Sequence, residues 1–434
     1  MSLSERVKST YIKILEEELI PAMGCTEPIA IAYCSSRARD LLGKMPDCMD
    51  IFVSNNIIKN VKSVVVPNTN GLKGIEAAAA AGLIAGNTEM KLEVISKVSD
   101  EQKSQICSML NELPIRVIPM EQGMVFDIEI ILKNGNDSSK VRISQYHTNI
   151  IYEERNGEIL LETELYRKLN KGELQDKEDG LADHSLLNIS DIIEFADTVD
   201  LEEVREILDR QIEYNSAIAD EGINGNYGAN IGKTLILTYG EDVRNRAMAK
   251  AAAGSDARMS GCEMPVVINS GSGNQGITVS VPVIEYAGHL GVSREVLYRA
   301  LIVSNLIAIH EKTGIGRLSA YCGAVSAGCA AGCGIAYLYG GGFEEISHTL
   351  VNSLAIVSGI ICDGAKASCA GKIAASVEAG ILGYHMYKNG QEFKKGEGIV
   401  NKDAESTIDN VSRLGKEGMR ETDKEIVKIM LAVG

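Results

Sequence analysis

Glycine and alanine dominate the second half of this chain and restrict how it can fold. The chain has 43 glycines among its 434 residues, and alanine clusters recur throughout the second half. Side chains this small give a well-packed interior only where backbones approach one another closely. The composition therefore favours tightly packed helices over a sandwich of sheets.

One such stretch, residues 318–343, is long enough to cross a membrane, which takes about 20 apolar residues. It consists mainly of Gly, Ala, Ser and Cys rather than Leu, Ile and Phe. That composition is typical of a buried central helix in a large soluble protein. The first residues contain no apolar signal-peptide region. We therefore expect a cytoplasmic protein without membrane association.

The first half has a mixed pattern of helices and strands. Apolar residues at helical spacing predict helices over residues 7–19, 26–42, 74–85 and 100–112, with Thr26 as an N-cap. Residues 134–137, Asn-Gly-Asn-Asp, predict a hairpin turn between two strands. Apolar and β-branched runs predict strands over residues 61–66, 91–98, 124–132, 140–146 and 150–154.

The second half is almost entirely helical in its pattern. Residues 168–190 are polar and charged, which is typical of a linker. We therefore predict an α+β fold with an N-terminal α+β domain (1–175) that carries Cys25 and a helical domain (190–434). Helices are predicted over residues 201–218, 243–253, 293–309, 320–338, 343–364, 369–387 and 423–431.

The charge of the chain argues against two classes of partner. Its formal net charge is −16 at pH 7, so it repels phosphate backbones and anionic lipids. Aromatic residues make up only 5% of the chain, and there is no Trp to stack on bases. We expect neither nucleic acid nor a membrane surface as a partner.

Five of the ten cysteines gather in one region: Cys322, Cys329, Cys333, Cys362 and Cys369. In a reducing compartment such cysteines are ligands, nucleophiles or core residues rather than disulfides. Thiolates are the ligands that iron–sulfur clusters and zinc require. The spacing matches neither a zinc ribbon nor a ferredoxin, and buried cysteines also serve as small apolar residues. Both interpretations stay open on spacing alone.

Cys25 stands apart, in the sequence Gly24-Cys-Thr-Glu-Pro28 just before a predicted helix. The positive end of a helix lowers the pKa of a nearby thiol, so Cys25 is a candidate thiolate near neutral pH. A thiolate there can act as a base or a nucleophile. The alternative is an ordinary cysteine in a turn.

Two glycine-rich turns, residues 66–74 and 269–276, offer backbone N–H groups and side-chain donors to an anion. Neither is a Walker A sequence, and each on its own is more often a tight turn than a site. Arg258 can bind a carboxylate through two parallel hydrogen bonds. Lys312, Arg317 and His147 are further polar candidates.

Taken together and in order, these motifs resemble one family. They are Gly24-Cys25-Thr-Glu-Pro28, Val66-Pro-Asn-Thr-Asn-Gly71, Ser255-Asp-Ala-Arg258-Met, the turn 269–276, and the set Cys322, Cys362 and Cys369. The chain looks like an L-cysteine desulfidase, a family related through its C-terminal part to the α chain of iron–sulfur L-serine dehydratases. The resemblance covers nearly the whole chain.

The resemblance implies a [4Fe–4S] cluster held by Cys322, Cys362 and Cys369, with one iron open and sensitive to oxygen. Cys25 then matches the base that removes the α-proton, while Cys329 and Cys333 are packing residues. The implied reaction is β-elimination on a small amino acid, which converts L-cysteine to sulfide, pyruvate and ammonia. From donor chemistry, the residues expected to bind the substrate are Asn68, Asn70, Arg258, Ser270, Ser272, Asn274 and Gln275.

Two alternatives remain at this point. An L-serine dehydratase would use the same mechanism with water as the leaving group. A thiolate sensor that binds a metal or a cluster would turn over no amino acid. The lone Cys25 in an activating turn argues against the sensor. The oligomeric state is open, with a homodimer among the possibilities.

Overall fold

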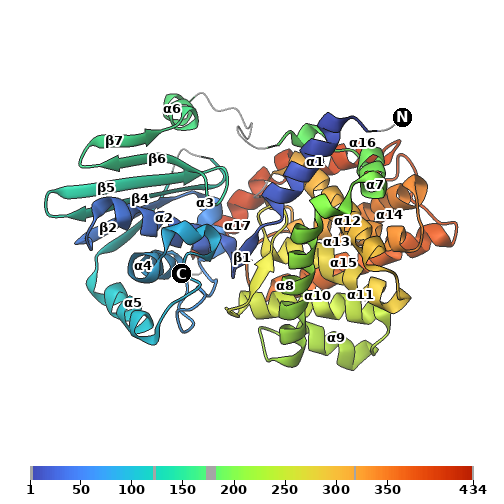
Figure 1. The fold of residues 1–434 in the computed structure, drawn as a ribbon, viewed down its shortest axis with the longest axis horizontal. Coiled ribbons are helices and arrows are strands. Elements are labelled where there is room, and N and C mark those ends of the chain that lie inside the picture. The colour runs from blue at the N-terminus through green and yellow to red at the C-terminus, as the bar shows by residue number, and fades with distance from the viewer. Residues whose placement is uncertain (1–2, 121–123, 173–181, 317–318, 433–434) are drawn as a thin grey trace.

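The computed structural model describes residues 3–120, 124–172, 182–316 and 319–432. A six-stranded sheet built from the first half of the chain lies beside a larger group of helices from the second half (Figure 1). We call this group, α7 to α16 with α1, the helical body. The predicted α+β fold class is confirmed.

The sheet has the strand order β3-β2-β4-β5-β6-β7. Only β2 and β3 run parallel, and the other neighbours are antiparallel. Helix α2 packs on β4 and β5, and α4 packs on α2. The strands are β2 (Cys48–Val53), β3 (Ile115–Pro119), β4 (Asp127–Asn134), β5 (Asp137–Ser144), β6 (Ile150–Arg155) and β7 (Glu158–Glu162). The accompanying helices are α2 (Thr26–Leu42), α3 (Asn55–Val61), α4 (Ile75–Ala85), α5 (Asp100–Glu112) and α6 (Glu164–Lys171).

The predicted hairpin at residues 134–137 is confirmed, because Asn134 pairs with Asp137 at the β4–β5 turn. The strands predicted over 61–66 and 91–98 are wrong. The first segment contributes only one isolated bridge, Val65 to Lys73, and the second overlaps a 3₁₀ helix, Thr88–Glu93. The apolar side chains of these segments are buried although the segments are not strands. A run of buried apolar residues in a loop resembles the sequence of a buried strand.

The helical body shows how glycine and alanine are used. Helices α13 and α15 cross so closely that a Cβ on Gly380 would lie 2.3 Å from the carbonyl oxygen of Gly328. A Cβ on Gly332 would lie 2.5 Å from the oxygen of Gly380. Its helices are α7 (Ile189–Thr198), α8 (Arg205–Asn224), α9 (Ile231–Tyr239), α10 (Val243–Met259), α11 (Gly273–Leu290), α12 (Arg294–Ile315), α13 (Gly323–Leu338), α14 (Phe343–Val357), α15 (Ser368–Lys388) and α16 (Ala404–Arg413).

The first residues of the chain pack on the helical body rather than on the sheet. Helix α1 (Glu5–Glu18) contacts α12, and the Tyr11 hydroxyl donates to the carbonyl of Leu186 at 2.8 Å. Strand β1 (Pro21–Met23) then pairs antiparallel with β8 (Pro265–Val267). This pairing fixes the chain to the helical body immediately before Cys25. The division into domains 1–175 and 190–434 stays a prediction, and residues 173–181 of the expected linker lie outside the described residues.

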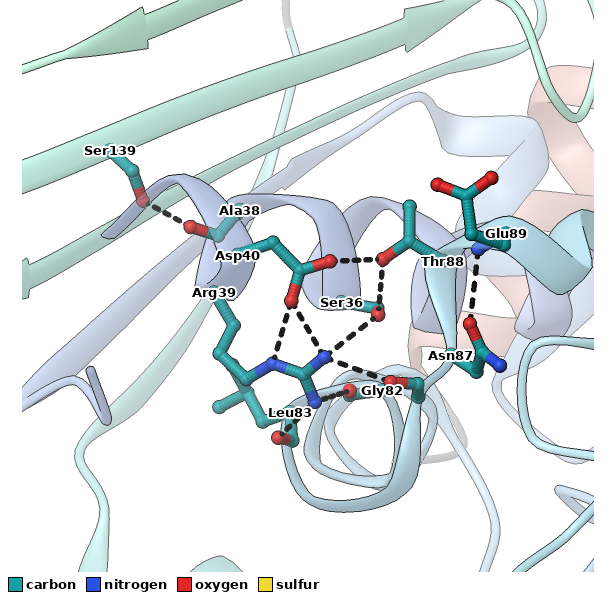
Figure 2. A network of polar contacts seen from close by, with 11 residues as sticks. Ser36, Ala38, Arg39, Asp40, Gly82, Leu83, Asn87, Thr88, Glu89 and Ser139 are labelled. Carbon is teal, nitrogen blue, oxygen red and sulfur yellow. Dashed lines mark hydrogen bonds and ion pairs between the residues drawn. The ribbon is translucent and has the colours of Figure 1, made fainter. Parts of the chain in front are cut away.

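A polar network fixes α2 against the end of α4 (Figure 2). The Arg39 guanidinium donates to the carbonyl oxygens of Gly82, Leu83 and Gly86, at 3.4, 2.9 and 2.8 Å. These carbonyls lie at the C-terminal end of α4, where a cation is also favoured by the helix dipole. Asp40 accepts from the same guanidinium at 2.7 Å. The network holds the helix whose other end carries Cys25.

The last helix returns to the first half of the chain. Helix α17 (Arg420–Ala432) packs on α3, where Lys59 forms an ion pair with Asp423. The Lys62 ammonium also donates to the carbonyl of Met430 at 2.9 Å. Helix α17 therefore joins the two halves of the molecule.

The helix that contains most of residues 318–343 is α13, which is buried in the helical body. Leu318 itself lies outside the described residues. Across the described parts of the chain, none of the helices combines the length and the apolar character needed to cross a bilayer.

Candidate active site

A cavity lies where α2 and α3 meet the helical body. It contains about 700 Å³ of space not filled by protein atoms, part of which is open solvent. Cys25, Cys322, Cys362 and Cys369 all line it. The remaining lining residues are Glu27, Asn60, Arg258, Ser272, Asn274, Gln275, Lys312, Ser319, Tyr321, Gly323, Ala324, Gly364, Ala365 and Ile373.

Backbone pairing brings two of these cysteines together from segments forty residues apart. Tyr321 and Ile361 form an isolated antiparallel bridge. Beside it, the Cys322 N–H donates to the oxygen of Ile360 at 3.2 Å and the Cys362 N–H to that of Ala320 at 2.6 Å. The two thiols share a hydrogen bond, which raises the pKa of Cys322 and lowers that of Cys362.

Cys369 completes the set from the first turn of α15. Burial raises its pKa, and the nearby thiol of Cys362 raises it further. Within the described residues, no three His, Cys, Asp or Glu side chains converge as ligands of a single metal ion do. In an iron–sulfur cluster each thiolate binds a different iron, so the sulfurs need not meet at one point. Cys322, Cys362 and Cys369 all line the same cavity.

Cys25 occupies the N-cap position of α2, which begins at Thr26. The expectation that Thr26 is the N-cap is therefore wrong by one residue. The Cys25 thiol donates to Oε2 of Glu27 at 3.1 Å. Burial, and then the charge of Glu27, raises the pKa of Cys25 well above its usual value, while Arg258 acts in the opposite direction. The predicted low pKa is thus wrong for the resting site, because burial outweighs the helix end.

The turn over residues 66–74 packs against Gly24, next to Cys25, and none of its residues lines the cavity. Gly24 has a φ of 62°, and a Cβ there would lie 2.1 Å from Cγ of Pro67. The Asn68 amide donates to the carbonyl of Ile95 at 2.8 Å, and Asn70 is exposed. Asn68 and Asn70, expected to bind substrate, therefore do not line the cavity.

Arg258 projects into the cavity from the last turn of α10 and is only 2% exposed. One guanidinium N–H donates to Oδ1 of Asn274 at 3.1 Å. Its Nε is buried and has no hydrogen-bond partner among the described residues. A Cβ on Gly273 would lie 2.4 Å from that Nε, so the glycine leaves room for the guanidinium. A buried cation with an unused donor is suited to bind a carboxylate.

The turn before α11 places its polar residues in different environments. Ser272, Asn274 and Gln275 line the cavity, and Oε1 of Gln275 is buried without a partner among the described residues. Ser270 does not line it, because its hydroxyl donates to Oδ1 of Asn269 at 3.0 Å. The Thr26 hydroxyl donates to the oxygen of Gly271 at 2.9 Å and so ties this turn to α2.

Four long helices begin at the cavity: α2 after Cys25, α11 after Ser272, α13 after Cys322 and α15 beside Cys369. Their N-termini carry partial positive charge and unpaired N–H groups. Together with Arg258, they make the cavity suited to an anionic group such as a carboxylate.

Two polar residues of the cavity, Glu27 and Asn60, were not predicted from the sequence. Glu27 and Asn60 line the cavity and contact each other, with the Asn60 amide donating to Oε1 of Glu27 at 3.1 Å. Glu27 could have been predicted, because it lies only two residues after the candidate Cys25. Asn60 had none, because its segment was not recognised as a helix. Lys312 does line the cavity, whereas Arg317 lies outside the described residues.

The other candidates are distant from this chemistry. Cys329 and Cys333 are fully buried within α13 and do not line the cavity, as expected of packing residues. His147 is buried against the ring of Phe126, with ring centroids 4.6 Å apart.

Comparison with known proteins places the chain in a described family. Residues 89–428 match the model of the serine dehydratase alpha chain. A UPF0597 protein of Desulfitobacterium hafniense (strain Y51) is 60% identical over 99% of this chain and 98% of its own length. UPF0597 proteins of Lachnoclostridium phytofermentans and Treponema denticola are 53% and 45% identical, over 97% and 99% of this chain and 99% and 100% of their own. The similarity therefore extends over both halves of the chain.

Proposed function

This chain belongs to the serine dehydratase alpha chain family, and on that basis we propose that it is a lyase acting on L-cysteine. The reaction is a β-elimination that releases sulfide and leaves aminoacrylate, which hydrolyses to pyruvate and ammonia. One observation supports this more than any other. Cys25 shares a cavity with Cys322, Cys362 and Cys369, although it comes from the opposite half of the chain.

β-Elimination needs three parts, and the cavity offers a candidate for each. A base must take the α-proton, a cation must hold the carboxylate, and a Lewis acid must assist the leaving group. We assign the first role to Cys25 and the second to Arg258. For the third, we assign Cys322, Cys362 and Cys369 as ligands of a [4Fe–4S] cluster, which when bound supplies an open iron as the Lewis acid.

Arg258 anchors the substrate carboxylate in this proposal. Its Nε is buried without a partner among the described residues, so a carboxylate there satisfies a donor that is otherwise costly to bury. Ser272, Asn274 and Gln275 surround the same region at the start of α11. The N–H groups of that helix end add donors for the second carboxylate oxygen.

Cys25 then acts on the α-carbon next to that carboxylate. In the resting site the thiol is protonated, because burial and Glu27 raise its pKa. Arg258 favours the thiolate. The base therefore becomes available as charges in the cavity are rearranged around a bound amino acid.

L-Serine is the alternative substrate, favoured by the family to which the chain belongs. A sulfur leaving group suits a soft iron site better than a hydroxyl does. Both substrates give pyruvate, and sulfide release distinguishes them.

The test uses protein purified and reconstituted with iron and sulfide without oxygen. We expect an iron–sulfur absorption band, with sulfide and pyruvate released from L-cysteine faster than pyruvate from L-serine. Cys25→Ser should keep the band and lose about 10²–10⁴-fold in turnover, the usual contribution of a positioned base. Cys362→Ala should lose both the band and turnover.

Cys329→Ala is the matched control, since Cys329 lies in the same helix as the Cys322 cap but outside the cavity. It should keep both the band and turnover. A cluster-loaded protein that releases neither sulfide nor pyruvate from either amino acid would contradict the proposal and favour a sensor.

A further inference from the structure

The cavity described above has an asymmetric set of charges. Arg258 and Lys312 are its cations, and Glu27 is the single carboxylate among the described residues that line it. An α-amino acid carries both charges on one carbon. Arg258 accounts for the carboxylate, which leaves the ammonium group without an assigned acceptor.

Glu27 is oriented so that it faces the cavity beside the thiol. Asn60 donates to its Oε1 and Cys25 to its Oε2, each at 3.1 Å. The Thr26 hydroxyl also contacts Oε2 at 3.1 Å. The one Thr26 hydroxyl proton can go to Gly271 instead, and a carboxylate accepts about four hydrogen bonds, so Glu27 has room for a further donor.

A second acceptor lies next to it. Asn60 is 5% exposed, and its Oδ1 is buried without a hydrogen-bond partner among the described residues. A buried carbonyl without a donor costs free energy, and an ammonium group supplies three donors. Glu27 and Asn60 both line the cavity, and the buried amide oxygen of Asn60 belongs to the residue that holds the Glu27 carboxylate.

We propose that Glu27, together with Asn60, binds the α-ammonium group of the substrate, so that the cavity selects α-amino acids over the matching α-hydroxy acids. The inference rests on the proposed function in taking an amino acid as the ligand. The Cys25 thiol donates to Glu27, and Arg258 is near enough for its charge to act on the same thiol, so the base is close to both proposed anchors. A bound ammonium would also neutralise the charge that raises the pKa of Cys25.

The test measures binding of L-alanine and L-lactate to the cluster-loaded protein by calorimetry. Neither has a β leaving group, so neither is consumed, and they differ only in ammonium against hydroxyl at the α-carbon. We expect alanine to bind at least tenfold more tightly than lactate, the scale of a hydrogen bond to a charged group. Glu27→Gln should reduce that preference to about twofold or less, and Asn60→Ala should reduce it partly.

Glu76→Gln is the matched control, because Glu76 is the second residue of α4 as Glu27 is of α2, but it is exposed and outside the cavity. It should keep the full preference. General damage to the site would weaken both ligands equally and leave their ratio unchanged.

Three results would overturn the inference: an unchanged ratio in Glu27→Gln, equal affinity of the unaltered protein for both ligands, or no binding of alanine. Failure of the proposed function looks different. There, the unaltered protein would prefer alanine and lose that preference in Glu27→Gln, yet release no pyruvate from cysteine or serine.

Discussion

Glu311 in α12 is buried, and neither of its carboxylate oxygens has a hydrogen-bond partner among the described residues. Burial raises its pKa well above the usual value, while Ser326 and Lys312 act in the opposite direction. An ionised carboxylate in such a place is very costly, so the side chain is a neutral acid. It lies near the thiols of Cys329 and Cys333, whose pKa values are raised first of all by burial.

This acid gives a pH dependence with a definite sign. The unfolded chain releases the Glu311 proton above about pH 4.3, whereas the folded chain keeps it. The folded state therefore binds more protons, and the free energy of unfolding falls as the pH rises. Glu311→Gln keeps the shape of the neutral acid and removes this slope. In urea unfolding, we expect the variant to gain stability over the unaltered protein at pH 8 and to gain less at pH 5.

Glu112→Gln serves as the control, because Glu112 is exposed at the end of α5. Its effect should be small and alike at both pH values. A Glu311→Gln variant that is equally destabilised at pH 5 and pH 8 would show that the acid is ionised and paired.

Some of the residues expected in the site line the cavity, and others do not. Cys25, Arg258 and the set Cys322, Cys362 and Cys369 belong to the motifs that resemble the family. All five of these residues line the cavity. Asn68, Asn70 and Ser270 have the same donor chemistry, yet each faces elsewhere. Donor chemistry alone does not say which way a turn presents its side chains. That direction depends on tertiary contacts such as the one between Gly24 and Pro67.

At the scale of elements, α2 is the helix on which the site most depends. It presents Cys25 and Glu27 at one end, and the Arg39 network holds the other end against α4 (Figure 2). Between them, Gly82 of α4 lies against the backbone of α2. A Cβ on Gly82 would lie 2.1 Å from the carbonyl oxygen of Ala32.

Gly82→Ala should therefore force the two helices apart. Overpacking against a backbone that cannot rotate away costs about 1–3 kcal/mol. We expect the free energy of unfolding to fall by that amount, and turnover to fall as well, because Cys25, the proposed base, caps α2. Gly288→Ala is the control, since Gly288 is exposed in α11 with nothing within 4 Å of the added Cβ. It should raise stability by up to about 1 kcal/mol. Equal effects of the two substitutions would argue against close helix contact at Gly82.

Helices with a strong apolar period were predicted well, and short or unusual elements were not. The helix expected over 100–112 is α5, with the same bounds. Helix α11 was missed, because it begins Gly-Asn-Gln-Gly and contains Pro282. Strands β2, β3 and β7 are five or six residues long and were also missed. Such strands are defined by their neighbours more than by their own sequence.

At the scale of the whole molecule, Lys59 and Asp423 join the two halves. The Lys59 side chain is 1% exposed and that of Asp423 is 18% exposed. Removing one partner of a buried pair leaves an uncompensated charge, at a cost of about 3 kcal/mol. We expect Asp423→Asn to lower the free energy of unfolding by roughly that amount.

Lys59→Met in the same chain provides the check. If the cost comes from an unpaired buried cation, the double variant should be more stable than Asp423→Asn alone. Lys424→Gln, in the same helix on an exposed lysine, should change little. Additive losses in the double variant would contradict the pairing.

The residues that line the cavity come from both halves of the chain, from Cys25 to Ile373. The β1–β8 pairing and the contacts of α17 hold these halves together. A gene fission between the sheet and the helices would give one polypeptide bearing Cys25 and another bearing Cys322, Cys362 and Cys369. Neither fragment would contain all the residues that line the cavity. Activity would be expected only after the two chains associated again through the β1–β8 pairing and α17.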